Sequence, residues 1–349
     1  MIISEWNQTE QEKIEILDLA MKAFGKCELT SSDYFNWQYL QNPNGKAIII
    51  TVKDPDNNNA IVGVNAFLPT TFIFHEKPLK CYLSCNSIIH PDYRNKGIFT
   101  QLVSKIPEIF STKKSSFIYG IPNSNSTKIF SKNHFLEIAK VPLIVRPLNL
   151  SLYFKSPFSK IIKPFDFFWK PKSSSSFDIK LLVNPFNDEF EKLIKKSSNN
   201  SSLFHFKNKE FLQWRYMDHP TRNYEIFTLN HDSKLIGYVI TRKMNIFSKK
   251  LGIIVDLVFD PEYEQKMLFQ NFIKNILSNF WQNNISLVIA SSKIGILESQ
   301  ILHNSRFFKA PSILKQEQLP LIILSLNSNN NQIQNFSNWL FSLGDYDVF

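Results

Sequence analysis

Residues 90–99, HPDYRNKGIF, bring a proline, an arginine, a lysine and a glycine together directly after an apolar run. Glycine is scarce in this chain, with 9 in 349 residues, so its presence here calls for a physical reason. Proline cannot donate to the interior of a sheet ladder, so the apolar run is expected to end as a strand near Pro91. The residues after Gly97 repeat apolar side chains at helical spacing, which predicts that a helix begins there.

The start of this helix has the chemistry of an anion site. The first turn of a helix exposes unpaired N–H groups and the positive end of the helix dipole, which together attract phosphate. Arg94 and Lys96 add positive charge at the same place. Gly97 removes the side chain where the backbone must approach an oxygen anion closely. The stretch therefore predicts a pyrophosphate cradle, although it has neither the P-loop pattern nor the glycine spacing of a dinucleotide-binding fold.

An internal repeat organises the elements around this stretch. The segments YFNWQYLQNP at 34–43 and FLQWRYMDHP at 211–220 share the pattern WxYxxxP. Trp37 and Trp214 are 177 residues apart (214 − 37), which is about half of the chain. A period this long indicates two copies of a whole domain and not a solenoid of short units.

The same order of elements follows each copy of the repeat. Three runs rich in β-branched and aromatic residues, separated by turn residues, predict antiparallel strands. A helical pattern, a strand, a second helix and a further strand come next, so each half is expected to be a mixed α/β (α+β) domain with a mostly antiparallel central sheet flanked by helices. The three runs are residues 46–54, 60–74 and 80–91 in the first half and 223–229, 234–244 and 251–261 in the second.

A segment rich in proline and serine separates the halves. Residues 151–178 contain spaced prolines and a run of serines, which mark a boundary between an N-terminal domain at 1–150 and a C-terminal domain at 179–349. The Phe, Trp and Lys side chains of this segment could also rest on an anionic membrane surface. Pro157 and Pro164 interrupt any long amphipathic helix, which favours a connector whose aromatic side chains pack on one of the domains.

Charge limits the partners of the chain. The net charge of +10 permits an anionic partner such as a phosphorylated cofactor, a membrane surface or nucleic acid. The lysines are dispersed, and no helix-turn-helix, zinc or RNA-binding pattern is present, so we expect no nucleic-acid partner.

Apolar runs and cysteines indicate the compartment. No apolar run approaches the roughly 20 residues that a bilayer requires, and the N-terminus lacks the pattern of a signal peptide, so we expect a cytoplasmic protein. Cys27, Cys81 and Cys85 have no metal-like spacing. They are expected to be reduced, with no metal site.

The stretch IIHPDYRNKGIFTQL resembles the acetyl-CoA-binding motif of the GNAT acyltransferases. Arg94 and Gly97 match the first two landmarks of that motif, whereas Phe99 stands where the family has glycine or alanine. The later segment NSNSTKIFSKNHF is similar to a second family pattern, with Asn123 and Lys132 in register. The form of the first motif resembles GNAT relatives of surface-polysaccharide biosynthesis.

This resemblance implies transfer of an acyl group from acetyl-CoA, or another acyl-CoA, to an amine. It also implies that the strand ending at Ile89 splays from its neighbour, so that backbone N–H groups of Ile88 and Ile89 hold the thioester carbonyl. The remaining cofactor contacts implied by the resemblance are Arg94, Asn95, Lys96, Gly97, Ile98, Phe99 and Thr100 at the phosphates, together with Asn123 and Lys132.

The acid and the base are less strongly indicated. His90, Ser87 and Asn86 lie at the end of the strand expected at 80–91 and are the candidate catalytic residues, with His90 able to accept a proton at neutral pH. Alternatively, His90 precedes a turn and binds backbone. The family's tyrosine acid falls on Phe130, and Tyr119 lies in an apolar strand where it is expected to be core, but a thiolate can leave without an assigned acid.

Two groups of residues could border the acceptor. Glu28 and Asp33 precede the first copy of the repeat, and Asp345 and Asp347 lie in the C-terminal segment SLGDYDVF, which could equally be a solvated tail. The repeated tryptophans could stack on a sugar ring. A motif repeated in two copies is more often core, and Trp37 is the better candidate for the exception.

The second half lacks the acyl-CoA motif. DPEYEQKMLFQ, at residues 260–270, keeps the Asp-Pro pair but has neither the arginine nor the glycine. Asp260, Glu262 and Glu264 would repel a pyrophosphate. We therefore expect a degenerate second copy that binds no CoA.

These observations predict an N-acyltransferase with two tandem domains. The expected acceptor is the amine of a small molecule such as an amino sugar or a nucleotide amino sugar, which rests on the resemblance and not on a physical argument. Aminoacyl or long-chain acyl transfer by paired GNAT-like domains is one alternative. A protein that binds acyl-CoA without catalysis is the other, because the tyrosine is missing and Phe99 departs from the motif.

Overall fold

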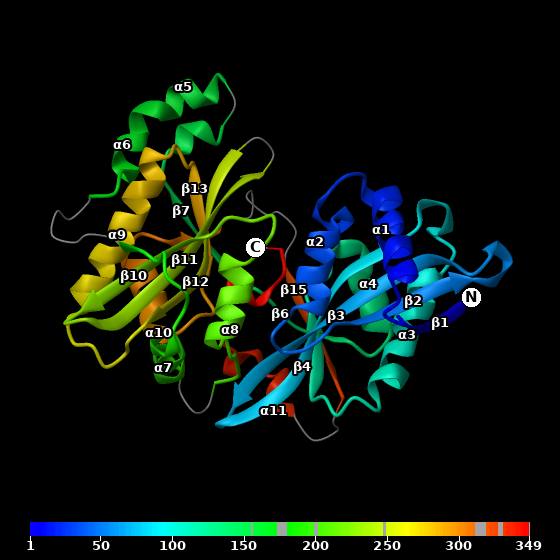
Figure 1. Cartoon of the computed structure of the whole chain (residues 1–349). Helices are drawn as coiled ribbons and strands as arrows, with labels where there is room; N and C mark the ends of the chain where they lie inside the picture. Colours follow the sequence, from blue (N-terminus) through cyan, green and yellow to red (C-terminus); the bar gives the residue numbers. More distant parts are fainter. Residues whose placement is uncertain are drawn as a thin grey trace. The chain divides into compact units, whose positions relative to one another are not determined.

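The computed structural model describes residues 1–154, 156–172, 180–198, 202–246, 249–310, 319–326 and 331–348 (Figure 1). The chain forms two compact units, and neither is a single stretch of sequence. The first unit contains Met1–Lys140, Glu210–Arg222 and Glu317–Trp339, and the second contains Val141–Lys209, Asn223–Gln316 and Leu340–Phe349. Of the proposed connector at 151–178, residues 155 and 173–178 lie outside the described part of the chain.

The first unit is built on a mixed sheet with the strand order β1-β2-β3-β4-β5-β15-β6. The pair β4–β5 is parallel, and the other pairs along this order are antiparallel. The strands are β1 (Ile2–Glu5), β2 (Ile48–Asp54), β3 (Ala60–Phe74), β4 (Lys77–Ile89), β5 (Phe117–Gly120), β15 (Pro320–Ser325) and β6 (Leu136–Lys140).

Helices pack on this sheet through apolar faces. The helix α1 (Glu10–Phe24) begins at Thr9, whose side chain accepts the N–H of Glu12, and it packs on β3 and β4. The helix α3 (Ile98–Phe110) packs on β1, β2 and β3 and against α4 (Ser124–Lys132). The predicted helix start after Gly97 is confirmed.

The second unit repeats the same strand order. Its sheet runs β8-β10-β11-β12-β13-β7-β14, with β12–β13 as the parallel pair. Its main helices are α7 (Asp188–Ser197), α9 (Lys266–Gln282) and α10 (Ile296–Asn304). The strands are β8 (Lys180–Leu181), β10 (Glu225–His231), β11 (Lys234–Ile246), β12 (Lys249–Phe259), β13 (Leu287–Ser291), β7 (Leu143–Pro147) and β14 (Phe308–Lys309).

One strand of each sheet comes from the other half of the sequence. β15 pairs with β5 and β6 in the first unit, and β7 pairs with β13 and β14 in the second. Both strands occupy the same place in the order, between the short parallel strand and the edge strand. The sequence repeat gave no sign of this exchange, because both strands are short apolar runs that fit either sheet.

The duplicated tryptophan motif forms core, as expected. Trp37 and Trp214 stack with ring centroids 4.6 Å apart. Each indole Nε1 donates to the backbone carbonyl of the other residue, at 2.8 Å and 2.9 Å. Trp37 also lies against His219 with centroids 4.0 Å apart, and both tryptophans are buried. The stacking of a sugar on Trp37 is therefore wrong, because its ring faces other side chains.

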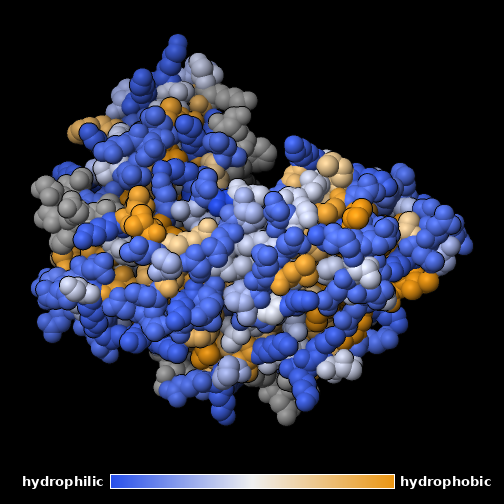
Figure 2. All heavy atoms as spheres, viewed as in Figure 1, coloured by the Kyte–Doolittle hydropathy of each residue, from blue (hydrophilic) through white to orange (hydrophobic). Residues whose placement is uncertain are grey.

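The viewed face of the molecule is largely polar (Figure 2). Figure 2 shows mostly hydrophilic side chains on the viewed face, with apolar side chains scattered among them. Within the described residues, no helix is both long and apolar enough to cross a membrane.

Candidate active site

The strand β4 leaves its parallel neighbour near its carboxyl end. Its pairing with β5 runs from Cys81–Phe117 to Ser84–Gly120, and β4 then continues to Ile89. A bulge accompanies the departure, since the register with β3 shifts between Val64 and Ala66, and Asn86 has φ 50°. A bulge bends a strand and redirects its backbone groups. The splay that the family resemblance implies is therefore present.

The register decides which N–H groups face the open edge of β4. His90 donates its N–H to the carbonyl of Val62 at 2.9 Å, and Ile89 lies opposite Gly63. Successive residues of an antiparallel strand turn their N–H groups to opposite sides. The Ile89 N–H therefore points away from β3, toward the side that β5 has left. The Ile88 N–H points back to β3.

A buried asparagine that the sequence analysis did not single out holds the bulge. Asn65 is fully buried, and its Nδ2 donates to the carbonyl of Cys85 at 2.9 Å and to Ser87 Oγ at 3.0 Å. Its Oδ1 accepts from Ser84 Oγ at 3.3 Å. The one available signal was an amide inside the apolar run of residues 60–68, where a buried polar group must find partners.

The loop between β4 and α3 is anchored near its start by a hydrogen bond, and near its end the backbone adopts the left-handed conformation. Tyr93 donates its hydroxyl to Asp54 Oδ2 at 2.5 Å, which ties the loop to the end of β2. Asn95 and Gly97 have φ 62° and φ 74°, in the left-handed region. A Cβ at Gly97 would meet no atom of the chain within 4 Å, so the conformation explains the glycine here.

The amino end of α3 keeps its backbone donors available. The first helical bond runs from Gln101 N–H to the carbonyl of Gly97, so the N–H groups of Ile98, Phe99 and Thr100 have no acceptor within the helix. Gly97 supplies no side-chain cap, and the first turn carries no acidic residue. The loop 94–97 is exposed, including Arg94 and Lys96. This end of α3 can bind an anion.

The residues of the second family pattern lie on or beside α4. Asn123 caps this helix by accepting the N–H groups of Asn125 and Ser126, and Lys132 is exposed in its last turn. Phe99, the departure from the motif, contacts Phe130 edge to face with centroids 5.5 Å apart. The larger side chain at position 99 thus packs on α4.

The three candidate catalytic side chains already have partners. Asn86 Nδ2 lies 2.9 Å from both Gln38 Oε1 and Tyr39 Oη, which belong to the turn η2 (Asn36–Leu40). His90 Nδ1 accepts the N–H of Asp92 at 3.3 Å, as in the alternative in which His90 binds backbone. That bond occupies the lone pair that a general base would use. Ser87 is exposed and accepts from Asn65.

The tyrosine alternatives are core. Phe130 and Tyr119 are both buried, and Tyr119 packs against Phe72 with ring centroids 5.3 Å apart. The expectation that Tyr119 is core is confirmed. Neither position offers a group that could protonate the leaving thiolate. Phe130 has no acidic proton, and Tyr119 is enclosed by aromatic rings.

In the second unit the corresponding N–H group is occupied by a carboxylate. Asp260 donates its N–H to the carbonyl of Ile236 at 2.8 Å, as His90 does to Val62, so Phe259 corresponds to Ile89. The Phe259 N–H donates to Glu298 Oε1 of α10 at 2.8 Å. Burial raises the pKa of Glu298 to about 7, despite the hydrogen bond from Phe259. The position that faces the open edge in the first unit is filled here.

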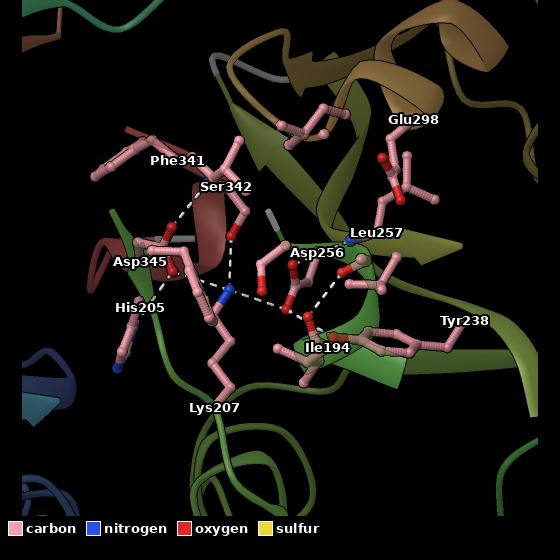
Figure 3. A pocket seen from close by; sticks show the side chains of 17 residues that line it. Ile194, His205, Lys207, Tyr238, Asp256, Leu257, Glu298, Phe341, Ser342 and Asp345 are labelled. Carbon is pink, nitrogen blue, oxygen red and sulfur yellow. Dashed lines mark hydrogen bonds and ion pairs between the residues drawn. The ribbon is translucent and has the colours of Figure 1, made fainter. Parts of the chain in front are cut away.

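A buried ionic cluster fills the same region of the second unit (Figure 3). Lys207 Nζ lies 3.0 Å from Asp256 Oδ2, 2.8 Å from Asp345 Oδ1 and 2.8 Å from Ser342 Oγ. His205 Nδ1 lies 3.2 Å from Asp345. Burial alone would raise the pKa of Asp345, but Lys207 and His205 outweigh it and lower this pKa to about 2. The cluster and Glu298 line a cavity of about 60 Å³.

This cluster corrects one expectation for the C-terminal segment. Residues 341–345 are buried, and Asp345 is ion-paired, so a solvated tail is wrong for these residues. At the other candidate acceptor group, Glu28 pairs with Arg222 and accepts from Thr221 Oγ at 3.0 Å. Asp33 lies in the first turn of the short helix α2 (Ser32–Phe35).

The loop before α9 differs from its counterpart before α3. Asp260 accepts the N–H of Glu262, and Lys196 pairs with both carboxylates, at 2.8 Å and 2.6 Å. With Phe259 matched to Ile89, Glu264 stands at the position of Arg94 and Met267 at that of Gly97, whereas Lys266 matches Lys96. Among the described residues, no group of three or more His, Cys, Asp or Glu side chains is placed to hold a metal ion.

Comparison with sequence-family profiles gives a match within the first unit. Residues 7–132 match the sequence profile described as acetyltransferase (GNAT) domain, a range that ends with α4 and includes β4, the loop and α3. No curated protein matched the sequence.

Solved structures show the fold across both units. A GCN5-related N-acetyltransferase from Anabaena variabilis is similar with TM-score 0.62 at 13% identity, covering 93% of this chain and 73% of that one. A probable N-acyltransferase from Enterococcus faecalis gives TM-score 0.63 at 11% identity, with coverage of 93% and 72%. N-myristoyltransferase of Saccharomyces cerevisiae with bound myristoyl-CoA gives 0.60 at 12%, with coverage of 93% and 82%. The chain therefore shares the fold of these structures over both of its units.

Proposed function

We propose that this protein is an acyl-CoA-dependent N-acyltransferase, most simply an N-acetyltransferase, whose first unit binds the acyl-CoA. The observation that carries the proposal is the pairing of two features in that unit. The Ile89 N–H points to the edge that β5 has left, and the N–H groups at the start of α3 have no acceptor within the helix. The match of residues 7–132 to the acetyltransferase domain supports the same assignment.

The backbone has the main role in this proposal. The attacking amine adds to the thioester carbon, the carbonyl oxygen becomes an oxyanion, and the Ile89 N–H donates to it. Ile88 is left out of this role, because its N–H is directed to β3. The nitrogen of the adduct loses a proton to water, the C–S bond breaks, and the thiolate leaves as CoA and takes a proton from water, so that the proton lost by the amine balances the one gained by the thiol. Arg94, Asn95, Lys96, Gly97, Ile98, Phe99 and Thr100 hold the phosphates.

The polar groups at the end of β4 are assigned by their contacts. Ser87 is the exposed hydroxyl at the bulge, and in this proposal it binds the incoming amine. Asn86 and His90 position the bulge and the turn after it, through Gln38, Tyr39 and the N–H of Asp92. Asn123 and Lys132 support the cofactor from α4.

The acceptor in this proposal is the amine of a small molecule. Amino sugars and nucleotide amino sugars, as in the synthesis of surface polysaccharide, are the first compounds to test. Transfer of a longer acyl chain is the second candidate, because the similar N-myristoyltransferase structure holds myristoyl-CoA. An acyl-CoA-binding protein without catalysis is the third, because the lone pair of His90 is engaged and Phe130 replaces a tyrosine.

The test is thiol release from acetyl-CoA and from longer acyl-CoAs, with a panel of amines. The decisive variants are Gly97→Asp and Gly97→Asn, which are nearly isosteric and both tolerate the left-handed conformation. Aspartate places a negative charge at the phosphate position. We expect turnover by the wild type, and roughly 100-fold lower kcat/KM for the aspartate variant than for the asparagine variant, from the repulsion of two negative groups at short range.

The alternatives give different results in the same assay. A folded wild type that binds acyl-CoA but releases no thiol with any acceptor would favour the non-catalytic protein. Release only with long acyl chains would favour the long-chain transferase. Equal kcat/KM in the two Gly97 variants would contradict the assignment of the phosphate site.

A further inference from the structure

A pair of short helices in the second unit exposes an unusual amount of aromatic surface. The segment comprises α5 (Phe158–Ile162), the turn η6 (Lys163–Phe165) and α6 (Asp166–Trp169). Its largest apolar side chains are exposed by 63% at Phe158, 62% at Ile161, 55% at Phe165, 76% at Phe167 and 66% at Phe168. The expectation that the aromatic side chains of the connector pack on a domain is wrong for these residues.

The exposure belongs to an ordered segment. Asp166 is buried and accepts the N–H and the hydroxyl of Ser151, at 3.0 Å and 2.5 Å. Arg306 donates to the carbonyl of Phe168 at 3.0 Å, and Arg146 donates to that of Trp169 at 2.9 Å. These contacts hold the backbone of the segment in place. The aromatic side chains are therefore exposed in the folded chain. Exposed apolar patches on such a scaffold commonly mark an interaction surface.

A cationic cavity of about 680 Å³ adjoins this surface. Phe167 and Phe168 line it on one side, and no acidic residue is among its lining residues. Across the described part of the chain, no carboxylate lies within ion-pair distance of its cations. The cations are Arg146, Lys170, Lys172, Lys274 and Arg306.

Arg146 makes the missing counter-ion most evident. The residue is 2% exposed, and its guanidinium donates to the carbonyls of Ser305, Pro147 and Trp169, all of which are uncharged. Burial, and then the charge of Arg306, lower its pKa to about 10. A buried charge is costly unless it is paired. An anion in the cavity would supply the pair.

We propose that this cavity binds the phosphate headgroup of an anionic membrane lipid, while the exposed aromatic side chains of α5 and α6 enter the boundary between headgroups and acyl chains. Both halves of the surface fit one occupant. Aromatic side chains favour the membrane interface, and basic residues are attracted to anionic lipid. In Figure 2, apolar and hydrophilic side chains are interspersed over the region where Figure 1 places α5 and α6. The proposal does not depend on the acyltransferase assignment.

A free phosphate compound or a nucleic acid would leave the aromatic surface unexplained. Phosphate alone needs only the cations, and nucleic acid would need bases stacked on the aromatic rings. The membrane accounts for the side chains of Phe158, Ile161 and Phe165, which do not line the cavity.

The experiment is co-sedimentation of the full chain with vesicles of phosphatidylcholine, with and without phosphatidylglycerol. Two double variants divide the surface, Phe167→Ser with Phe168→Ser and Lys170→Glu with Lys172→Glu. The matched controls change exposed residues elsewhere, Val183→Ser with Met267→Ser and Lys77→Glu with Lys80→Glu. Circular dichroism checks that all variants are folded.

We expect binding to the anionic vesicles that weakens with salt. Each surface variant should bind roughly 10-fold less, while the controls bind as the wild type does. Equal loss in the controls would overturn the proposal, because the effect would then follow net charge or hydrophobicity alone. Binding of glycerol phosphate or of an oligonucleotide without binding to vesicles would overturn it as well.

Discussion

The loop before α3 and the loop before α9 follow corresponding strands but carry opposite chemistry. In the first unit, Arg94 and Lys96 flank a helix start with available N–H groups. In the second, Glu264 replaces the arginine and Met267 the glycine, and Asp260 and Glu262 in the same loop pair with Lys196. Duplication preserved the scaffold, and a few side chains decide whether its helix start can receive a phosphate.

The same contrast holds at the edge that the short parallel strand leaves. Both long strands carry a bulge, shown by a register shift between Val64 and Ala66 in β3–β4 and between Ile240 and Thr241 in β11–β12. The Ile89 N–H faces the open edge, whereas the Phe259 N–H is held by Glu298. A carboxylate oxygen thus takes the place of the acyl carbonyl that we propose for the first unit.

The largest effect is expected from removing Lys207, the buried cation of the cluster in the second unit. Lys207→Met leaves Asp256 and Asp345 buried without their cation, which should lower the free energy of unfolding by about 3–5 kcal/mol. Urea unfolding measures the loss. Binding of acetyl-CoA below the unfolding transition should be unchanged. A loss of binding without a loss of stability would show that the cluster serves the cofactor.

Glu298 provides a pH test of the same region. Its pKa is about 7 in the folded chain and near the ordinary value of 4.5 in the unfolded chain, so the folded state binds more protons between these values. The stability from the protonated carboxyl is fully present below pH 4.5 and is lost as pH rises through 7, in total about 3 kcal/mol.

Glu298→Gln should remove this contribution, because the amide oxygen can still accept from Phe259 and does not titrate. The variant should gain stability over the wild type as pH rises from 5 to 8. Thermal unfolding at a series of pH values measures the difference. Parallel stability profiles for the two proteins would contradict the assigned shift.

Asn65→Leu tests whether the bulge of β4 in the first unit contributes to catalysis. Leucine keeps the volume but removes the donors to Cys85 and Ser87, which should cost about 1–3 kcal/mol of stability. If the bulge positions the Ile89 N–H, kcat should fall while the dissociation constant of acetyl-CoA changes little. An unchanged kcat in a folded variant would separate the bulge from catalysis.

Arg94→Ala is expected to have the smallest effect. Arg94 is exposed, and its side chain donates to the carbonyl of Ala23 at 3.3 Å. Its loss should weaken acetyl-CoA binding about 3- to 10-fold, as for an exposed charge pair. Lys77→Ala, also an exposed cation of the first unit, is the control. A loss above 100-fold would mean that the side chain and not the backbone carries the affinity.

Local chemistry made much of the first unit predictable. Pro91 and Gly97 marked a strand end and a helix start, which the structure has at Ile89 and Ile98. The duplicated tryptophans predicted two copies, and the two sheets share their strand order. These features depend on neighbouring residues and on spacing, which the sequence carries directly.

Long-range pairing was not predictable in the same way. The exchange of β7 and β15 depends on which sheet edge is free, and short apolar runs do not specify it. Glu298 lies 39 residues from Phe259, and Lys207 lies 138 residues from Asp345 (345 − 207), so their contacts follow from the fold alone. For His90 the sequence left a catalytic role and a hydrogen bond to backbone both open, and the geometry shows that its Nδ1 accepts the N–H of Asp92.

The most direct test of the account is calorimetric titration of acetyl-CoA into the wild type and into Gly97→Asp and Gly97→Asn. We predict one site per chain, retained in the asparagine variant and lost in the aspartate variant, with no effect of Gln265→Asp, which changes the N-cap residue of α9 as Gly97 is the N-cap residue of α3. Two sites per chain, or one site that survives Gly97→Asp and is lost in Gln265→Asp, would contradict it.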